Sequence, residues 1–193
     1  MMPATLAPKD EVIDRLFAVF RERGFEGASI SDLSRATGLG KSSLYHHFPE
    51  GKTQMAEVVL GRAAALIDNA ILRVARSPDP LKVRIRRIVA TLEQFYAGGR
   101  TPCLLGQLAG SEIGATAQWS LQQAFDHWIK AIEELARDGG MPPARARAFA
   151  EDWVARLQGA LIIQAATGTA GPFERALKAL FELAKDHAPP IEG

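Results

Sequence analysis

Apolar residues recur at helical spacing along most of this chain, and that pattern limits the fold more than any other feature. In the first segment, apolar side chains stand at positions 12, 13, 16, 17 and 20, and Gly24 follows as a stop signal. Later segments repeat the pattern between glycines and prolines, and no alternating run is long enough to predict a strand. We therefore predict an all-α fold of about nine helices.

Capping residues place several helix ends. Ser29 is a good N-cap residue, and Asp32, three residues later, can complete a capping box in place of the usual glutamate. Gly38 ends that second helix, and a short third helix follows at residues 41–48. Further along, Asp79 is predicted to cap a helix whose first residue is Pro80. Residues 101–117 are less regular and predict one short helix and a turn.

Length and composition exclude several classes of protein. The 193 residues suit one large or two small domains, and a formal net charge of +1 excludes a strongly basic coat, so any nucleic acid must bind a local face. The single cysteine, Cys103, allows no disulfide within the chain and no cysteine-based zinc site. The N-terminus does not resemble a signal peptide, and no apolar run approaches the ~20 residues of a membrane span. We expect a soluble cytoplasmic protein without a membrane role.

Residues 29–48 have the plan of a helix-turn-helix, in which the second helix enters the major groove of DNA. Leu44 and Phe48 lie one turn apart and can anchor this short helix. Hydroxyl, phenol and imidazole groups on the rest of its surface can bond phosphates or base edges; they belong to Ser42, Ser43, Tyr45 and His46. Lys41 adds a cation at the start of the helix. Lys52, at the start of the fourth helix, can hold a phosphate together with backbone N–H groups.

Several of these side chains have alternative roles. Tyr45 is either a core residue or a phosphate contact, and the contact is favoured because other residues already define the inward face. His47 either packs or caps the helix, or it faces DNA with His46; adjacent helical positions diverge, which argues against a metal site on this pair. Ser29 is first an N-cap and second a phosphate contact. Ser31 contacts phosphate or simply faces solvent.

The charge balance of the first sixty residues weakens the prediction that this region binds DNA. This region holds seven lysines and arginines against eight aspartates and glutamates. Much of the acid lies on the first helix, which can face away from DNA. We therefore expect salt-sensitive binding with few direct cation contacts in each DNA-binding head.

The run from Gly38 to Phe48, Gly-Leu-Gly-Lys-Ser-Ser-Leu-Tyr-His-His-Phe, closely resembles the recognition region of TetR-family regulators. In that family a Leu-Tyr-x-His-Phe core is followed by a lysine at the start of the next helix, and the Ser-x-x-Asp-Leu segment at 29–33 fits the family's second helix. Lys52 stands one residue later than the commonest spacing. Residues 102–109, Pro-Cys-Leu-Leu-Gly-Gln-Leu-Ala, resemble the LmrA/YxaF-like branch of the family.

The resemblance implies a division of labour along the chain. Residues 9–52 would form a three-helix DNA-binding domain, and residues 53–188 a helical ligand-binding and dimerisation domain. A homodimer would place two heads on a palindromic double-stranded DNA operator, with half-sites about 34–36 Å apart. The last two helices would form the interface, or else be buried within one subunit; the residues concerned are Trp153, Leu157, Leu161, Leu177, Leu180 and Phe181.

The expected function is a transcriptional repressor that a small, largely apolar effector releases from its operator. Aromatic and amide side chains of the second region can line the effector pocket, or they are ordinary core; they are Phe95, Gln107, Trp119, Phe125, Trp128 and Gln164. No cofactor or metal is expected. A redox role for Cys103 would need a lowered pKa and a resolving partner, and the sequence supplies neither.

Two other classes of function compete with the regulator. An enzyme would need a nucleophile, a base and an oxyanion donor acting together, and no Ser-His-acid or metal signature is present, so we expect no enzyme. A helical interaction module without affinity for DNA is the other alternative. The outer face of the third helix separates these interpretations, because only a regulator needs Tyr45 and Lys52 to bind DNA.

Overall fold

The computed structural model describes residues 8–184, and these form helices and no strand. α4, η1 and α5 are one continuous helix with a π-helical turn inside it, so the described residues contain nine separate helices, which confirms the all-α prediction. In chain order the elements are α1 (Lys9–Gly27), α2 (Ile30–Thr37), α3 (Lys41–His47), α4 (Lys52–Ile67), η1 (Asp68–Leu72), α5 (Arg73–Ala75), α6 (Leu81–Phe95), α7 (Leu104–Leu108), α8 (Ala115–Asp138), α9 (Pro143–Thr167) and α10 (Gly171–Glu182).

The described chain divides into two compact units. Unit 1 contains the residues up to Ala64 together with Leu104–Gln122, and unit 2 contains Ala65–Cys103 and the residues from Gln123 onward. The division predicted between residues 52 and 53 falls at the start of α4. Residues 185–188 of the second predicted range lie outside the described residues. Unit 1 therefore joins the helix-turn-helix to a segment that is remote in sequence.

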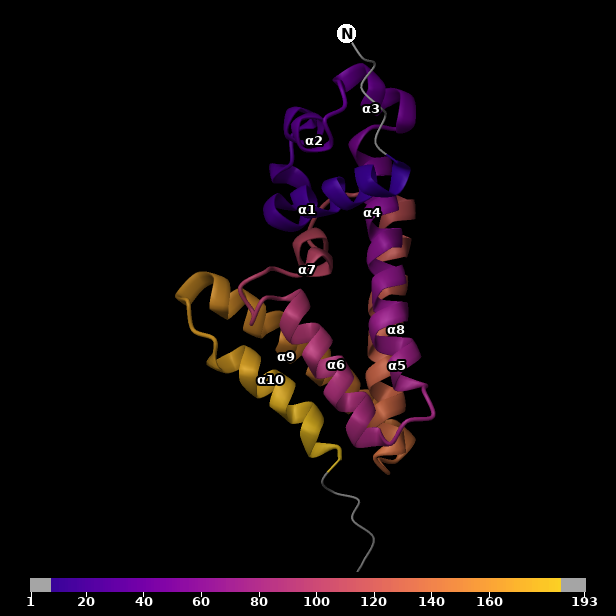
Figure 1. The fold of residues 1–193 in the computed structure, drawn as a ribbon, viewed down its shortest axis with the longest axis vertical. Coiled ribbons are helices and arrows are strands. Elements are labelled where there is room, and N and C mark those ends of the chain that lie inside the picture. The colour runs from indigo at the N-terminus through magenta and orange to yellow at the C-terminus, as the bar shows by residue number, and fades with distance from the viewer. Residues whose placement is uncertain (1–7, 185–193) are drawn as a thin grey trace, which may run out of the picture. The chain divides into compact units, whose positions relative to one another are not determined.

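In unit 1, α2 and α7 pack against α1, and α3 packs against α2. Leu16 and Phe20 of α1 are completely buried, as are Leu33 of α2 and Leu44 of α3. α7 lies beside α1 (Figure 1). Gly24 interrupts α1 as predicted, with φ +68° and ψ −177°, although a last helical turn continues to Gly27.

In unit 2, α6, α9 and α10 pack together around large apolar side chains (Figure 1). Trp153 of α9 is buried, and its Nε1 donates to the carbonyl of Ala176 in α10 at 2.7 Å. The buried Arg84 of α6 donates to the carbonyl of Ala75 and, at 2.6 Å, to Asp138. These bonds join α9 to α10, and the start of α6 to the ends of α5 and α8.

The start of α6 differs from the prediction. Pro80, not Asp79, occupies the N-cap position, and α6 begins at Leu81. Pro80 has extended backbone angles, φ −52° and ψ 142°, so it cannot be the first helical residue. Asp79 instead accepts hydrogen bonds from Ser77, at 3.2 Å, and from Arg87.

None of the helices found between residues 8 and 184 combines the length and the apolar composition that crossing a bilayer requires.

Candidate nucleic-acid interface

The start of α2 is fixed by a complete capping box. The Ser29 hydroxyl accepts from the Asp32 amide at 3.1 Å and donates to the Asp32 carboxylate at 2.5 Å, while the Ser29 amide donates to that carboxylate at 3.2 Å. The hydroxyl hydrogen bond, then the amide bond, hold the pKa of Asp32 below its usual 3.8; Arg23 and Arg35 act in the same direction. The N-cap role predicted for Ser29 is therefore confirmed, and its hydroxyl is already engaged.

The turn between α2 and α3 is held by bonds to its carbonyl groups. Gly38 adopts the left-handed conformation with φ +72°. The Ser34 hydroxyl donates to the carbonyl of Leu39 at 2.6 Å, and Arg15 of α1 donates to the carbonyl of Thr37 at 3.0 Å. Leu39 is buried and packs the turn against the helices. These contacts fix the position of α3 relative to α1 and α2.

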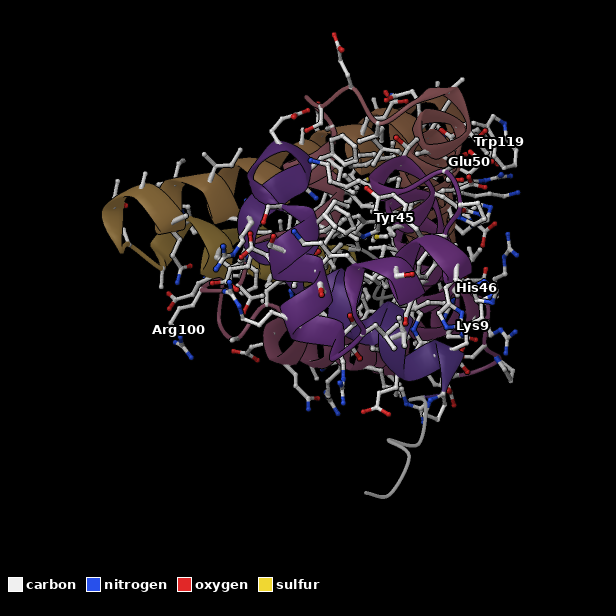
Figure 2. The ribbon with its side chains drawn as sticks, turned by 90° about the horizontal axis from the view of Figure 1, so that it is seen from above. Lys9, Tyr45, His46, Glu50, Arg100 and Trp119 are labelled. Carbon is white, nitrogen blue, oxygen red and sulfur yellow. The ribbon has the colours of Figure 1, made fainter. Side chains whose placement is uncertain are left out.

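α3 carries its apolar and polar residues on different faces. Leu44 and Phe48 are buried and anchor it, as predicted. Lys41, Ser42 and His46 are exposed, and Tyr45 is 48% exposed, so Tyr45 is not a core residue. Figure 2 looks onto this face and labels Tyr45 and His46. Four different polar groups are thus presented to solvent on one short helix.

The remaining candidates on α2 and α3 have mixed environments. Ser31 is exposed on the first turn of α2, and Ser43 is half-buried. His47 is exposed, and the centre of its ring lies 6.4 Å from that of Phe48. The contacts of these three residues with DNA stay predictions.

The Lys52 side chain is bonded within unit 1, and its predicted contact with phosphate stays a prediction. Its side chain turns toward α1, where Nζ donates to the carbonyl of Phe25 at 2.9 Å and lies 4.4 Å from the centre of the Phe25 ring. The residue is half-buried. The ammonium group expected to hold a phosphate is therefore bonded within unit 1.

Gly51 supports a candidate DNA contact, a role that the sequence alone does not indicate. It has φ +68°, and a Cβ atom placed on it would lie 3.2 Å from Cε1 of the Tyr45 ring. The Gly51 amide also donates to the carbonyl of Phe48 at 2.8 Å. The glycine in the run Pro49–Lys52 indicates a turn, but nothing local indicates that a tyrosine ring covers it.

The residues predicted to line an effector pocket are divided between the units. Gln107 and Trp119 belong to unit 1, where both are exposed, Trp119 by 62%. The other four belong to unit 2: Phe95 and Phe125 are half-buried, and Trp128 and Gln164 are buried. The structure does not bring the six residues together in one unit.

Unit 2 contains cavities and unsatisfied polar atoms. A cavity of about 440 Å³ lies between α6 and α10, and one of about 410 Å³ lies between α9 and α10. Val89, Leu177 and Phe181 supply apolar walls to the first cavity. Separately, the Trp128 Nε1 and Gln164 Oε1 atoms are buried and have no hydrogen-bond partner within the described residues. Buried polar atoms of this kind are uncommon and call for a partner.

The residues predicted to form a dimer interface are mostly buried within one subunit. Trp153, Leu157, Leu161, Leu177 and Leu180 are at most 6% exposed within a single subunit, and Phe181 is half-buried. The five buried side chains leave little surface for a partner, because they pack within their own subunit. The exposed large apolar residues on this part of the chain are Ile162 and Ile163 of α9, at 68% and 46%.

Residues 8–184 contain neither a cluster of metal-binding side chains nor a pair of cysteines. Residues 8–184 hold no group of three or more His, Cys, Asp or Glu side chains that could bind a metal ion. Cys103 is buried, and its Sγ accepts from Tyr96 Oη at 3.4 Å and from Gln158 Nε2 at 3.3 Å.

Comparison with known proteins matches both parts of the chain. The profile of the bacterial regulatory proteins of the TetR family matches residues 12–59, and that of the LmrA/YxaF-like transcriptional regulator C-terminal domain matches residues 81–179. The HTH-type transcriptional repressor DhaR of Mycobacterium sp. (strain GP1) is 24% identical over 90% of each chain. The biofilm operon icaADBC HTH-type negative transcriptional regulator IcaR of Staphylococcus aureus is 36% identical over 45 residues, 23% of this chain and 24% of that one.

The fold also has close counterparts among solved structures. A TetR transcriptional regulator from Legionella pneumophila superposes with a TM-score of 0.81 at 16% identity, covering 94% of this chain and 98% of that one. These findings confirm the resemblance seen in the recognition segment and in residues 102–109. The chain therefore belongs to the TetR family of bacterial DNA-binding transcriptional regulators, with a C-terminal domain of the LmrA/YxaF-like type.

Proposed function

We propose that this regulator is a repressor that a small, largely apolar effector releases from a palindromic DNA operator. The exposed polar face of α3 carries the proposal. Lys41, Ser42, Tyr45 and His46 lie there, and none of their side chains makes a hydrogen bond or ion pair within the described part of the chain. Their donors and acceptors are free for phosphates and base edges, while Leu44 and Phe48 keep the helix in place.

Repression, as opposed to activation, is supported by the relatives. DhaR is a transcriptional repressor, and IcaR is a negative regulator whose similarity is confined to 45 residues. We assign DNA binding to residues 9–52, and effector binding and dimerisation to residues 53–188.

The effector is proposed to bind in unit 2, against its apolar core. The unpartnered indole N–H of Trp128 would donate to an acceptor on the effector, and the unpartnered amide oxygen of Gln164 would accept from a donor. Phe95 and Phe125, which are half-buried in the same unit, would supply apolar contacts. A mostly apolar molecule with one or two polar groups fits this set of side chains. Effector contacts of Gln107 and Trp119 stay predictions.

The active form is proposed to be a C₂ homodimer that pairs through the outer face of α9. Ile162 and Ile163 are large apolar side chains that a monomer would leave in water, and burying them favours association. A symmetric dimer carries two copies of α3, which can read the two halves of a palindrome.

Release by the effector is proposed to be a two-state linkage. One state holds the two heads at the spacing that the operator needs, and the effector favours another. Reciprocity then requires operator binding to weaken effector binding by the same factor.

The test is a mobility-shift titration of the purified protein on its own upstream DNA, at two salt concentrations and with nonspecific competitor. We expect a discrete complex that resists competitor and weakens with salt. A screen of apolar compounds follows, and each hit is titrated with and without operator. Equal effector affinities in both titrations would contradict the linkage. DNA binding that nonspecific competitor abolishes would contradict the proposed repressor function.

A further inference from the structure

Lys52 makes a polar contact with a residue of the DNA-binding head that is distant in sequence. It is the first residue of α4, and its Nζ lies 2.9 Å from the carbonyl oxygen of Phe25, 27 positions earlier. The same ammonium lies 4.4 Å from the centre of the Phe25 ring. Together, the hydrogen bond and the cation–π contact with Phe25 hold the Lys52 ammonium group in one position.

The carbonyl group of Phe25 is open to Lys52 because α1 is broken at Gly24. The residues after the break, Phe25 to Gly27, form the last turn of α1, and the terminal carbonyls of a helix lack intrahelical donors. No basic residue stands in that last turn. Lys52 supplies the missing cation from another helix, at the end where the helix dipole favours positive charge. Phe25 is itself fixed, because it is buried and stacks on Phe20 with ring centres 6.1 Å apart.

Lys52 also directly follows the turn that supports Tyr45 of α3. The preceding residue, Gly51, is buried and has the Tyr45 ring against it. The Gly51 amide is bonded to the carbonyl of Phe48, the residue that ends α3. Fixing Lys52 against α1 therefore also fixes the turn on which Tyr45 rests.

We propose that Lys52 is a positioning residue for DNA binding: it ties the start of α4 to the end of α1 and thereby holds α3 and Tyr45 in their DNA-binding arrangement, without contacting phosphate. The phosphate-binding cation of this surface is then Lys41, which is exposed and has no partner among the described residues.

The test compares Lys52→Met with the matched control Lys41→Met. Each variant replaces an ammonium by a neutral side chain of similar length. Affinity for a duplex recovered by random-site selection with the wild-type protein is measured over a series of salt concentrations. The slope of log affinity against log salt reports how many phosphates the protein neutralises, at about 0.9 for each phosphate. The wild-type titration tests DNA binding itself, so its failure is distinct from failure of this inference.

We expect Lys52→Met to weaken binding about three- to tenfold while its salt slope equals that of the wild type. Lys41→Met should weaken binding and reduce the slope by about 0.9 for each phosphate that Lys41 neutralises in the wild-type complex. Lys52→Arg keeps the charge and the donors and should bind nearly as the wild type does. Thermal melting of each variant identifies a temperature at which all are folded, so that lost stability does not register as lost affinity.

Two results would overturn the proposal. A reduced salt slope in Lys52→Met would show that Lys52 contacts phosphate. Unchanged affinity in the folded variant would show that the bond to Phe25 only stabilises the fold. If Lys52→Met is unfolded at the measuring temperature, Lys52→Gln, which is neutral but polar, is measured in its place and judged by the same slope and affinity.

Discussion

Replacing Gly51 by alanine should destabilise the protein through a single methyl group. Gly51 has φ +68°, a left-handed conformation that disfavours an L side chain by roughly 1–2 kcal/mol. The new Cβ would also lie 3.2 Å from the Tyr45 ring, so the ring must shift by a few tenths of an ångström. We expect the free energy of unfolding to fall by about 1–2 kcal/mol, which lowers Tm by about 2–8 °C for a chain of this size. Affinity for DNA should fall as well, because Tyr45 lies on the recognition face.

Gly61→Ala is the matched control for this prediction. Gly61 lies within α4 in the same unit, has no positive φ, and has no atom within 4 Å of the position that a Cβ would take. Alanine is the better helix former, so this variant should be more stable than the wild type by about 0.5–1 kcal/mol. Scanning calorimetry on both variants checks the pair. If Gly51→Ala melts at or above the wild-type Tm, or if Gly61→Ala loses as much stability, the reasoning from backbone conformation is wrong.

Three further predictions follow from the caps and the packing. Ser29→Ala removes the N-cap of α2 and should lower the free energy of unfolding by about 0.5–2 kcal/mol in urea denaturation. The lowered pKa of Asp32 means that its contribution to stability is complete above its unfolded pKa, near 3.8, and is lost as the pH falls toward the folded value. The stability difference between the wild type and Asp32→Asn should therefore shrink below about pH 4 and stay constant above it; a difference that grows on acidification would contradict the assigned hydrogen bonds. Ile162→Asp should convert the dimer to monomers in sedimentation without loss of helix, whereas Leu157→Ala should lower stability by about 2–5 kcal/mol and leave association intact; a dimeric Ile162→Asp would exclude this face of α9.

Local sequence signals predict the helices well because their causes are local. Ser29 and Asp32 form the capping box that their three-residue spacing indicates. Gly38 takes the left-handed conformation at the end of α2, and Leu44 and Phe48 anchor α3. Each of these features depends on residues within about one or two helical turns, so a single sequence contains the necessary information.

Features that depend on distant residues are not predictable in the same way. The sequence places Lys52 on the DNA side because helix starts attract phosphate, but its partner is the carbonyl of Phe25, made available by the break at Gly24. The apolar residues of α9 and α10 that suggest a dimer interface, such as Leu157, are buried in their own subunit. Periodicity shows that a helix has an apolar face, and it does not show whether a neighbour in the same chain or in another chain covers that face.

Random-site selection tests the central claim most directly, because it asks whether α3 reads a DNA sequence. The wild-type protein is compared with Lys41→Met/Tyr45→Ala, which alters exposed side chains of α3 and should keep the wild-type helix content, and thermal melting identifies a selection temperature at which both proteins are folded. We predict that the wild type enriches one palindromic sequence with two half-sites and that the variant enriches none. Failure of the wild type to enrich any sequence, or recovery of the same palindrome by the variant, would contradict DNA recognition through the outer face of α3.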